Sequence, residues 1–147
     1  PVLRKDFTLD PYMIYQARTL GASAILLICS LLSQSELEEY QAIATELGMS
    51  ALVEAHDEQE VEMALRAEAS IIGVNNRDLK TFTVDINNSA RYRKMVPKEV
   101  AFVSESGIKT AEDIAKLLKN GTDAVLIGET LMRSENKKQA LDELRGI

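Results

Sequence analysis

Strand-sized apolar runs alternate with segments of helical period along this chain, and this alternation constrains its fold more than any other feature. Most of the intervening segments carry one apolar stripe, as at Leu37, Tyr40 and Ala44. Six strands joined by helices predict an all-parallel sheet with helical crossovers. The apolar runs are Val2-Leu3, Ala24 to Cys29, Ala51 to Ala55, Ile71 to Val74, Ala101 to Val103 and Ala124 to Ile127.

Two architectures satisfy this pattern: a closed barrel and an open, doubly wound sheet. Neither of the glycine fingerprints G-x-G-x-x-G and G-x-x-x-x-G-K-[ST] follows the first apolar run, Val2-Leu3. This weakens the open nucleotide-binding sheet. Periodicity by itself leaves both architectures open.

Local signals indicate where the helices begin and end. Gly21, Gly48 and Gly121 are expected to follow helix C-termini, where a left-handed residue is needed. The expected N-terminal signals are Asp10-Pro11, capping boxes at Ser35/Glu38 and Asp57/Glu60, and caps at Thr110 and Ser134.

Composition restricts the class of protein and its partners. With 147 residues, 46% of them hydrophobic and 27% charged, the chain is expected to form a single domain over residues 1–147. The 17 Lys+Arg and 23 Asp+Glu residues leave a net charge of −6, which argues against nucleic acid or an anionic membrane as a partner. One cysteine, Cys29, and one histidine supply neither an internal disulfide nor a zinc site, so no metal is expected.

The same reading bears on cellular location. The longest apolar run, Ala24 to Cys29, is far too short to span a bilayer, and the first residues do not have the character of a signal peptide. A reduced, cytoplasmic protein is therefore expected. The chain begins without methionine, directly in a strand-like run, and we expect its natural N-terminus to lie upstream.

Polar residues stand where the expected strands end, which is where parallel α/β folds carry their chemistry. If the inward faces of neighbouring strands carry these groups, the groups converge. An acid between Val53 and Ala55, in a strand buried on both faces, is costly unless it is paired or functional, so Glu54 is the strongest signal. The strand-end groups are Lys5, Glu54 with His56, Asn75 with Arg77, Ser104 to Ser106, and Gly128 with Glu129.

Each of these groups also has a purely structural interpretation. Glu54 could be an exposed rim carboxylate, Lys5 a solvated strand edge, and Asn75-Asn76 a turn. Arg77 could be a surface residue, and we interpret His56 as a polar strand-end residue rather than a catalyst.

Small residues after the last two strands suggest a site for an anion. Ser106-Gly107 precedes a helix expected to be capped at Thr110, and Gly128 follows the final strand. This pattern is typical of the phosphate cradle that the last two βα loops form in many barrels, where backbone amides bind the ligand.

Five strand motifs together resemble the indole-3-glycerol-phosphate synthase family, over the whole chain. Their order and spacing are similar to those of the third, fifth, sixth, seventh and eighth strands of that family. The resemblance implies a (β/α)8-barrel, here an incomplete barrel of six βα units that lacks the first two, about three quarters of the parent enzyme. The motifs are Pro1-Val-Leu-Arg-Lys-Asp-Phe7, Leu52-Val-Glu-Ala-His56, Ile72-Gly-Val-Asn-Asn-Arg-Asp-Leu79, Val103-Ser-Glu-Ser-Gly-Ile108 and Leu126-Ile-Gly-Glu-Thr-Leu-Met132.

The resemblance also implies a reaction, the closure of the indole ring of 1-(2-carboxyphenylamino)-1-deoxyribulose 5-phosphate with loss of carbon dioxide and water, in tryptophan biosynthesis. No cofactor or metal is implied. Lys5 would be the general acid, Glu54 would assist proton transfer, and Asn75 would orient the substrate. Phe7 and Leu126 would pack against the aromatic ring, Arg77 would lie near the phosphate, and Glu105 and Ser106 would line the wall. Ser106, Gly107, Gly128 and Glu129 would form the phosphate-binding turns, Glu129 through its amide only.

Two rival functions stay open at this point. One is another phosphate-binding barrel, such as a sugar-phosphate isomerase or an α-subunit of the tryptophan synthase type; the other is an inert domain used for association. The family's first-strand motif, with a further catalytic glutamate and a phosphate-binding lysine, is absent from the sequence. We therefore expect the isolated chain to be inactive or feebly active and to self-associate through open strand edges.

Overall fold

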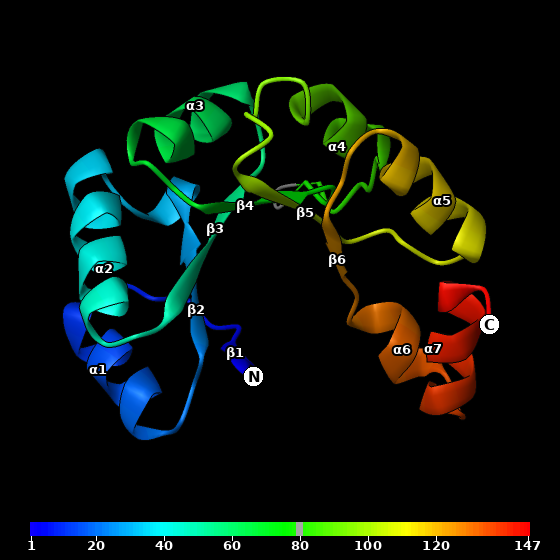
Figure 1. The fold of residues 1–147 in the computed structure, drawn as a ribbon, viewed down its shortest axis with the longest axis horizontal. Coiled ribbons are helices and arrows are strands. Elements are labelled where there is room, and N and C mark those ends of the chain that lie inside the picture. Colours follow the sequence, from blue (N-terminus) through cyan, green and yellow to red (C-terminus); the bar gives the residue numbers. More distant parts are fainter. Residues whose placement is uncertain (79–80) are drawn as a thin grey trace. The chain divides into compact units, whose positions relative to one another are not determined.

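The computed structural model describes residues 1–78 and 81–147, which form two compact units, residues 1–73 and 74–147. Leu79, the last residue of the predicted Ile72–Leu79 motif, lies outside the described residues. Strands and helices alternate along the chain (Figure 1).

Six strands occur within a residue or two of their predicted places. Strand order in the sheet follows chain order, β1-β2-β3-β4-β5-β6. Strands β2 and β3 pair in parallel in the first unit, with Leu26 opposite Leu52, and β5 and β6 pair in parallel in the second, with Glu105 opposite Leu126. The prediction of parallel βα units is confirmed. The elements are β1 (Leu3–Arg4), α1 (Pro11–Thr19), β2 (Ala24–Ile28), the 3₁₀ turn η1 (Cys29–Leu31), α2 (Gln34–Glu46), β3 (Ser50–Ala55), α3 (Glu58–Arg66), β4 (Ile71–Asn75), α4 (Asn87–Tyr92), β5 (Ala101–Glu105), α5 (Ala111–Lys119), β6 (Ala124–Leu126), α6 (Glu129–Arg133) and α7 (Lys137–Arg145).

The core of the first unit lies between β2 and β3 and the helices beside them. Strand β2 is apolar on both faces, as expected for a parallel strand covered by helices, and Ile25 to Ile28 are buried. Helices α1 and α2 contribute Ile14 and Leu37, which are completely buried. Each such side chain contributes about 1.5–3 kcal/mol relative to an exposed one. This packing fixes the directions of β1 and β3. Lys5 directly follows β1, and Glu54 lies in β3.

Helix α2 begins two residues earlier than predicted. Its N-cap is Ser33, whose side chain accepts the amide of Glu36 while the Glu36 side chain returns to the Ser33 backbone N–H. The predicted capping box at Ser35/Glu38 is therefore wrong. Both serines are followed three residues later by glutamate, so the local pattern fits two registers, and the structure adopts the one that also buries Leu37.

Two other caps differ from prediction. Asp57 caps α3 by accepting the amide of Glu60 at 2.9 Å, but the Glu60 side chain bonds the backbone N–H of His56 at 2.8 Å instead of closing a capping box. Asn136, rather than Ser134, caps α7. The Asp10 and Thr110 caps are confirmed, as are the left-handed glycines after α1, α2 and α5.

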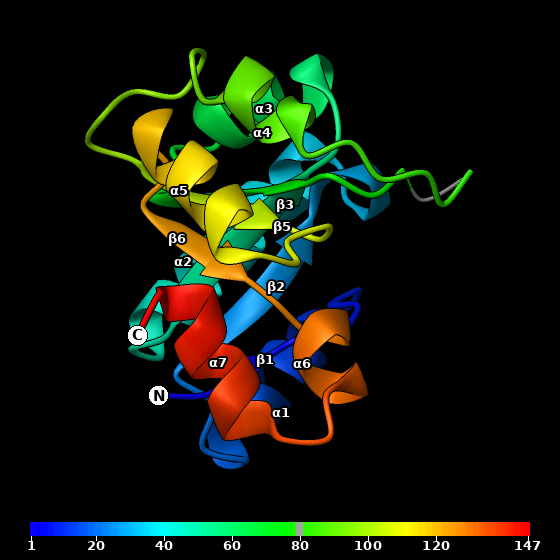
Figure 2. The same ribbon diagram turned by 90° about the vertical axis from the view of Figure 1, so that its right-hand side faces the viewer.

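The second unit is organised around β5. Phe102 is completely buried, and helices α5, α6 and α7 pack near one another; α6 and α7 lie side by side in both views (Figures 1 and 2). Within the part of the chain that the structure describes, no helix has the length and apolar character needed to cross a membrane.

Candidate active site

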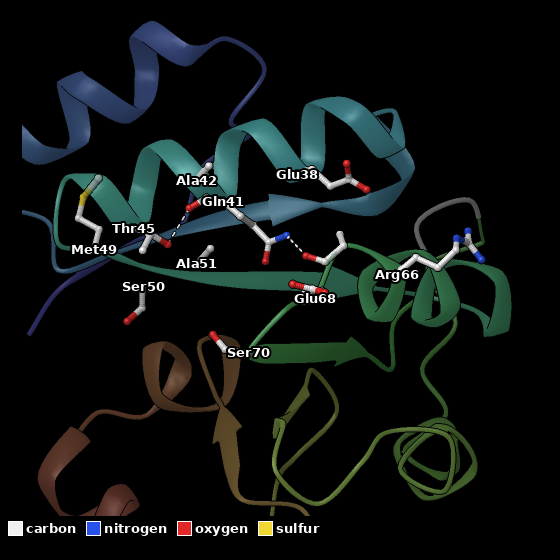
Figure 3. Close-up of a pocket in the computed structure, with 11 residues that line it drawn as sticks. Glu38, Gln41, Ala42, Thr45, Met49, Ser50, Ala51, Arg66, Glu68 and Ser70 are labelled. Carbon is white, nitrogen blue, oxygen red and sulfur yellow. Dashed lines mark hydrogen bonds between the residues drawn. The ribbon is translucent and has the colours of Figure 1, made fainter.

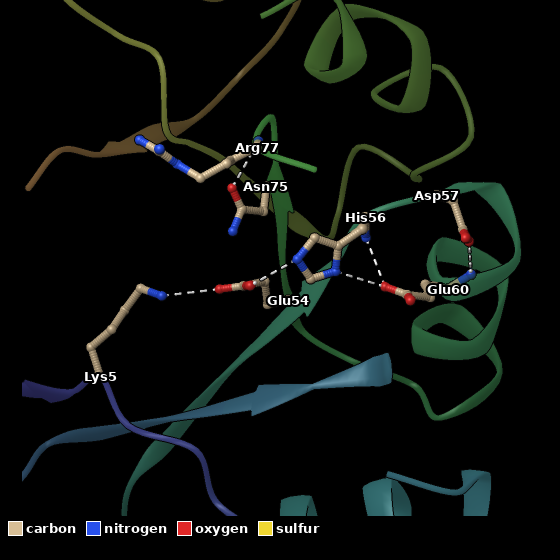
Figure 4. A network of polar contacts seen from close by, with 7 residues as sticks. All are labelled: Lys5, Glu54, His56, Asp57, Glu60, Asn75 and Arg77. Carbon is tan, nitrogen blue, oxygen red and sulfur yellow. Dashed lines mark hydrogen bonds and ion pairs between the residues drawn. The ribbon is translucent and has the colours of Figure 1, made fainter. Parts of the chain in front are cut away.

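Lys5 and Glu54 meet in the first unit. Lys5 directly follows β1, and Glu54 is the next-to-last residue of β3. The Lys5 Nζ and Glu54 Oε2 atoms are 3.0 Å apart, with the lysine side chain 40% exposed and the glutamate side chain 3% exposed (Figure 4). The convergence of these two strand-end groups is thus confirmed.

The second carboxylate oxygen of Glu54 also has a cationic neighbour. His56, two residues further along the chain, places its Nε2 atom 3.1 Å from Glu54 Oε1. A buried carboxylate without partners costs several kcal/mol. The contacts with Lys5 and His56 compensate for that cost, so Glu54 is not the exposed rim carboxylate of the structural interpretation.

His56 is held from its other side by α3. Its Nδ1 atom lies 3.0 Å from Glu60 Oε2, the atom that also accepts the His56 backbone N–H. Burial lowers the pKa of His56, but the hydrogen bonds to Glu54 and Glu60 outweigh it and raise the pKa from 6.5 to about 9. At neutral pH the ring is therefore an imidazolium between two carboxylates.

Cys29 lies near the same acids and is buried. Burial raises the pKa of its thiol to about 12, and the charges of Glu60, Asp57 and Glu54 add to the effect. A neutral thiol at this place agrees with the interpretation of Cys29 as a small apolar core residue.

The two asparagines at the end of β4, in the second unit, have different surroundings. Asn75 accepts the backbone N–H of Arg77 through Oδ1 at 3.0 Å (Figure 4). Asn76 is 1% exposed and donates through Nδ2 to Ser104 Oγ at 3.0 Å and to the Ser106 carbonyl at 3.1 Å. Its Oδ1 accepts both the N–H and the hydroxyl of Ser89. Asn76 is therefore a structural residue that fixes the turn after β5.

Arg77 pairs with Glu129. Arg77 Nη2 lies 2.7 Å from Glu129 Oε2, and Arg133 Nε lies 2.9 Å from the other oxygen, Oε1. These hydrogen bonds hold the pKa of the exposed Glu129 carboxyl below its usual value, and the bond from Arg77 has the larger effect. The negative charge of Glu129, which would repel a phosphate, is thus compensated by two guanidinium groups.

The turns after β5 and β6 come together in the second unit. The Thr130 hydroxyl, one residue past Glu129, donates to the Ile108 carbonyl at 2.8 Å. Ser106 and Gly107 have left-handed φ angles of 65° and 79°, and a Cβ on Gly107 would overlap the Val84 side chain. A side chain there would both strain the backbone and collide, so Gly107 is required by its surroundings.

The remaining predicted residues lie as follows. Phe7 follows β1 and is 60% exposed. Glu105 ends β5, is buried, and pairs in register with the half-buried Leu126. Gly128 is exposed and immediately precedes α6.

Among residues 1–78 and 81–147, no cluster of three or more His, Cys, Asp or Glu side chains could hold a metal ion.

A hollow of about 820 Å³ lies elsewhere in the first unit, over α2, the start of β3 and the end of α3 (Figure 3). Its lining includes Ser50, at the opposite end of β3 from Glu54, and Gln41, whose Nε2 donates to the Ala67 carbonyl at 2.9 Å. It does not include any of the predicted site residues.

The sequence analysis did not predict the observed contacts of three polar side chains. Glu60 was assigned to a capping box, His56 to a polar strand end, and Asn76 to a turn. A signal for the first two exists: His56 shares a strand face with Glu54, and Glu60 follows it by four residues, the spacing of one helical turn. Asn76 bonds residues 13 and 28 positions away, so no local pattern reveals it.

Comparison with known proteins identifies relatives over nearly the whole chain. Residues 1–144 match the family described as indole-3-glycerol phosphate synthase. The indole-3-glycerol phosphate synthase of Ruminiclostridium cellulolyticum is 60% identical over 146 residues, which are 99% of this chain and 56% of that protein. That of Leuconostoc mesenteroides subsp. mesenteroides is 53% identical, with the same coverage. The chain thus spans about 56% of these relatives, less than the three quarters expected.

Solved structures give the same fold at low identity. A tryptophan synthase α2β2 complex from Pyrococcus furiosus matches with a TM-score of 0.75 and 17% identity, over 100% of this chain and 65% of that one. A mandelate oxidase mutant with an FMN adduct matches with a TM-score of 0.76 and 16% identity, over 98% and 55%. These likenesses concern the fold alone and agree with six βα units of a (β/α)8-barrel.

Proposed function

Because the chain belongs to the indole-3-glycerol phosphate synthase family, we propose that it carries the acid–base pair of an enzyme that forms indole-3-glycerol phosphate in tryptophan biosynthesis. The substrate would be 1-(2-carboxyphenylamino)-1-deoxyribulose 5-phosphate, and the products would include carbon dioxide and water. The observation that carries the proposal is the 3.0 Å contact between Lys5 Nζ and the buried Glu54 carboxylate. No cofactor or metal takes part.

Lys5 would act as the general acid. As the aromatic carbon attacks the ketone carbon, the ammonium group donates a proton to the ketone oxygen, which becomes a hydroxyl. Glu54 orients the lysine ammonium through their 3.0 Å contact and leaves the lysine side chain partly accessible to substrate. General acid–base catalysis of this kind contributes about 10²–10⁴-fold to a rate.

Glu54 would assist the steps that follow. Loss of the carboxylate as carbon dioxide removes the substituent at the attacked ring position, and the new hydroxyl then leaves as water as a proton is taken from the ring intermediate. A buried carboxylate beside Lys5 is suited to stabilise positive charge that develops during these steps.

The other predicted residues would bind substrate. Asn75 would orient the sugar chain and Glu105 would line the wall, while Phe7 and Leu126 would pack against the aromatic ring. The exposed side chain of Phe7 leaves its ring accessible to the aromatic ring of the substrate. Arg77 would lie near the phosphate.

The phosphate would be bound by the backbone amides of Ser106, Gly107, Gly128 and Glu129. The Thr130–Ile108 hydrogen bond supports this assignment because it joins the two turns. The pairing of Glu129 with Arg77 and Arg133 supports it further, since an uncompensated carboxylate would repel the anion.

A biosynthetic enzyme of this kind would be cytoplasmic. The chain spans about 56% of its relatives, so we expect feeble activity of the isolated chain and self-association through its strand edges. The match over residues 1–144 favours this activity over that of a sugar-phosphate isomerase, a tryptophan synthase α-subunit or an inert association domain.

Lys5→Met in the complete enzyme tests the proposal. We expect kcat to fall by about 10²-fold or more with KM little changed, because the proton is needed in the transition state. Lys119→Met, at an exposed position on α5, is the matched control and should leave both constants unchanged. A Lys5→Met enzyme that keeps more than about a tenth of wild-type kcat would refute the assignment.

A further inference from the structure

His56 bridges two carboxylates with its two ring nitrogens. Nε2 faces Glu54 Oε1 at 3.1 Å, and Nδ1 faces Glu60 Oε2 at 3.0 Å (Figure 4). A neutral imidazole has one N–H and one lone pair, so one of these contacts would set a lone pair against an anionic oxygen. Only the imidazolium donates in both directions.

We propose that His56 is a positioning residue whose imidazolium, clamped by Glu60, fixes the Glu54 carboxylate with its other oxygen directed at Lys5. The role of Glu54 in catalysis rests on the proposed function, whereas the clamp itself rests on the contacts alone. The four side chains form a line of alternating charge: Lys5 positive, Glu54 negative, His56 positive and Glu60 negative.

Glu60 is the anchor of this line. Its position is set by the first turn of α3, where its amide is bound by the Asp57 side chain at 2.9 Å. The Glu60 Oε2 atom accepts both the ring Nδ1–H and the backbone N–H of His56, so ring and backbone are held by one atom. Because Nδ1 makes a hydrogen bond to Glu60 and Nε2 an ion pair with Glu54, the ring cannot rotate without breaking one of these two contacts.

Two acids contact the His56 ring, and one cation lies beyond them. Glu54 and Glu60 contact the ring, and both acids favour the imidazolium; Asp57, the N-cap of α3, is the next acid along the chain. Lys5 lies on the far side of Glu54, in contact with its other oxygen. Cys29 adds no charge, because its thiol pKa is about 12. The net result is a His56 pKa of about 9, so the clamp is intact at neutral pH and opens only in alkaline solution.

The sequence contains one histidine, so the test can be direct. The protein is labelled with ¹³C-histidine and the single ring signal is followed by NMR from about pH 5 to about pH 11. We expect a midpoint near 9 and, in Glu60→Gln, a midpoint lower by about one pH unit or more, since the amide keeps an acceptor but loses the charge. Glu58→Gln, at an exposed position on the same helix, is the matched control and should not move the midpoint. A midpoint near 6.5 in the folded protein, or one that Glu60→Gln leaves in place, would overturn the clamp.

Activity of the complete enzyme tests the positioning role separately. In Glu60→Gln, the alkaline limb of the kcat–pH profile should shift by the same amount as the NMR midpoint, with KM unchanged. His56→Gln should lower kcat by about tenfold or more, as expected when a reacting group loses its orientation. If the NMR result holds but His56→Gln keeps wild-type kcat, His56 has no positioning role. If the wild-type enzyme itself does not form indole-3-glycerol phosphate, the proposed function fails, while the NMR result still decides the clamp.

Discussion

The buried amide of Asn76 offers a measurable test of how the second unit is held together. Its Oδ1 accepts the N–H of Ser89 at 3.1 Å, and Ser89 is the third residue of α4, whose first amides have no partner within the helix. The N-cap residue of α4, Ile86, supplies no side-chain cap, so Asn76 caps this helix from 13 residues away.

Asn76→Ala removes this cap together with the bonds to Ser104 and Ser106. The hydroxyls of Ser89 and Ser104 remain hydrogen-bonded to each other at 2.7 Å, and the half-buried Ser106 carbonyl can bind water. The buried Ser89 N–H is therefore the group left unsatisfied. The lost cap and the orphaned Ser89 N–H are the same interaction, and an orphaned buried donor costs about 1–3 kcal/mol. We therefore expect a loss of about 1–3 kcal/mol in the free energy of unfolding.

Urea denaturation gives the total loss, and amide hydrogen exchange at Ser89 gives the local one. Protection of the Ser89 amide should disappear in Asn76→Ala. Asn87→Ala, an exposed position on the same helix, should change stability by less than about 0.5 kcal/mol. A loss below about 1 kcal/mol in Asn76→Ala, with Ser89 still protected, would refute the capping argument.

Three further predictions concern the turns and the site. Gly107→Ala should destabilise the protein by more than about 1 kcal/mol beyond Gly48→Ala in thermal unfolding, because both glycines have positive φ but only Gly107 would collide with Val84; equal losses would contradict this. The pKa of His56 is higher in the folded chain, about 9, than its usual 6.5, so its contribution to stability is full below about pH 6.5 and is lost as pH rises through about 9, by up to about 3 kcal/mol. Urea melts across this range should show the decline in wild type and not in His56→Gln. Glu54→Gln in the complete enzyme should lower kcat by about 10²-fold or more in a steady-state assay, and a mutant that unfolds readily yet turns over normally would make Glu54 purely structural.

Patterns that repeat along the chain predicted the fold well. Apolar runs such as Ala24–Ile28 and the glycines after helices are local consequences of burial and backbone geometry, so a single sequence displays them. Ambiguity arose where two local patterns compete, as at Ser33 and Ser35. Leu118 illustrates another limit. It extends the helical spacing of Ile114 and Leu117 on α5 but is exposed, because periodicity alone does not specify how wide a face is covered.

The polar clusters were predicted in part. Burial of an acid within an apolar strand identified Glu54, and the contact with Lys5 followed from the meeting of strand ends. The sequence did not reveal that His56 connects Glu54 to Glu60, because Glu60 also fits a capping box. Side chains that act through contacts distant in sequence, such as Asn76, leave no periodic trace.

The most direct test of the proposed function is a complementation assay. The chain is mixed with the part of the Ruminiclostridium cellulolyticum relative that it does not match, and formation of indole-3-glycerol phosphate from the carboxyphenylamino substrate is followed. We predict feeble turnover by the chain alone, a clear gain with the complementing segment, and loss of that gain in Lys5→Met. Substrate turnover that is equally fast in Lys5→Met, or none in the complemented chain although the two pieces associate, would contradict the account.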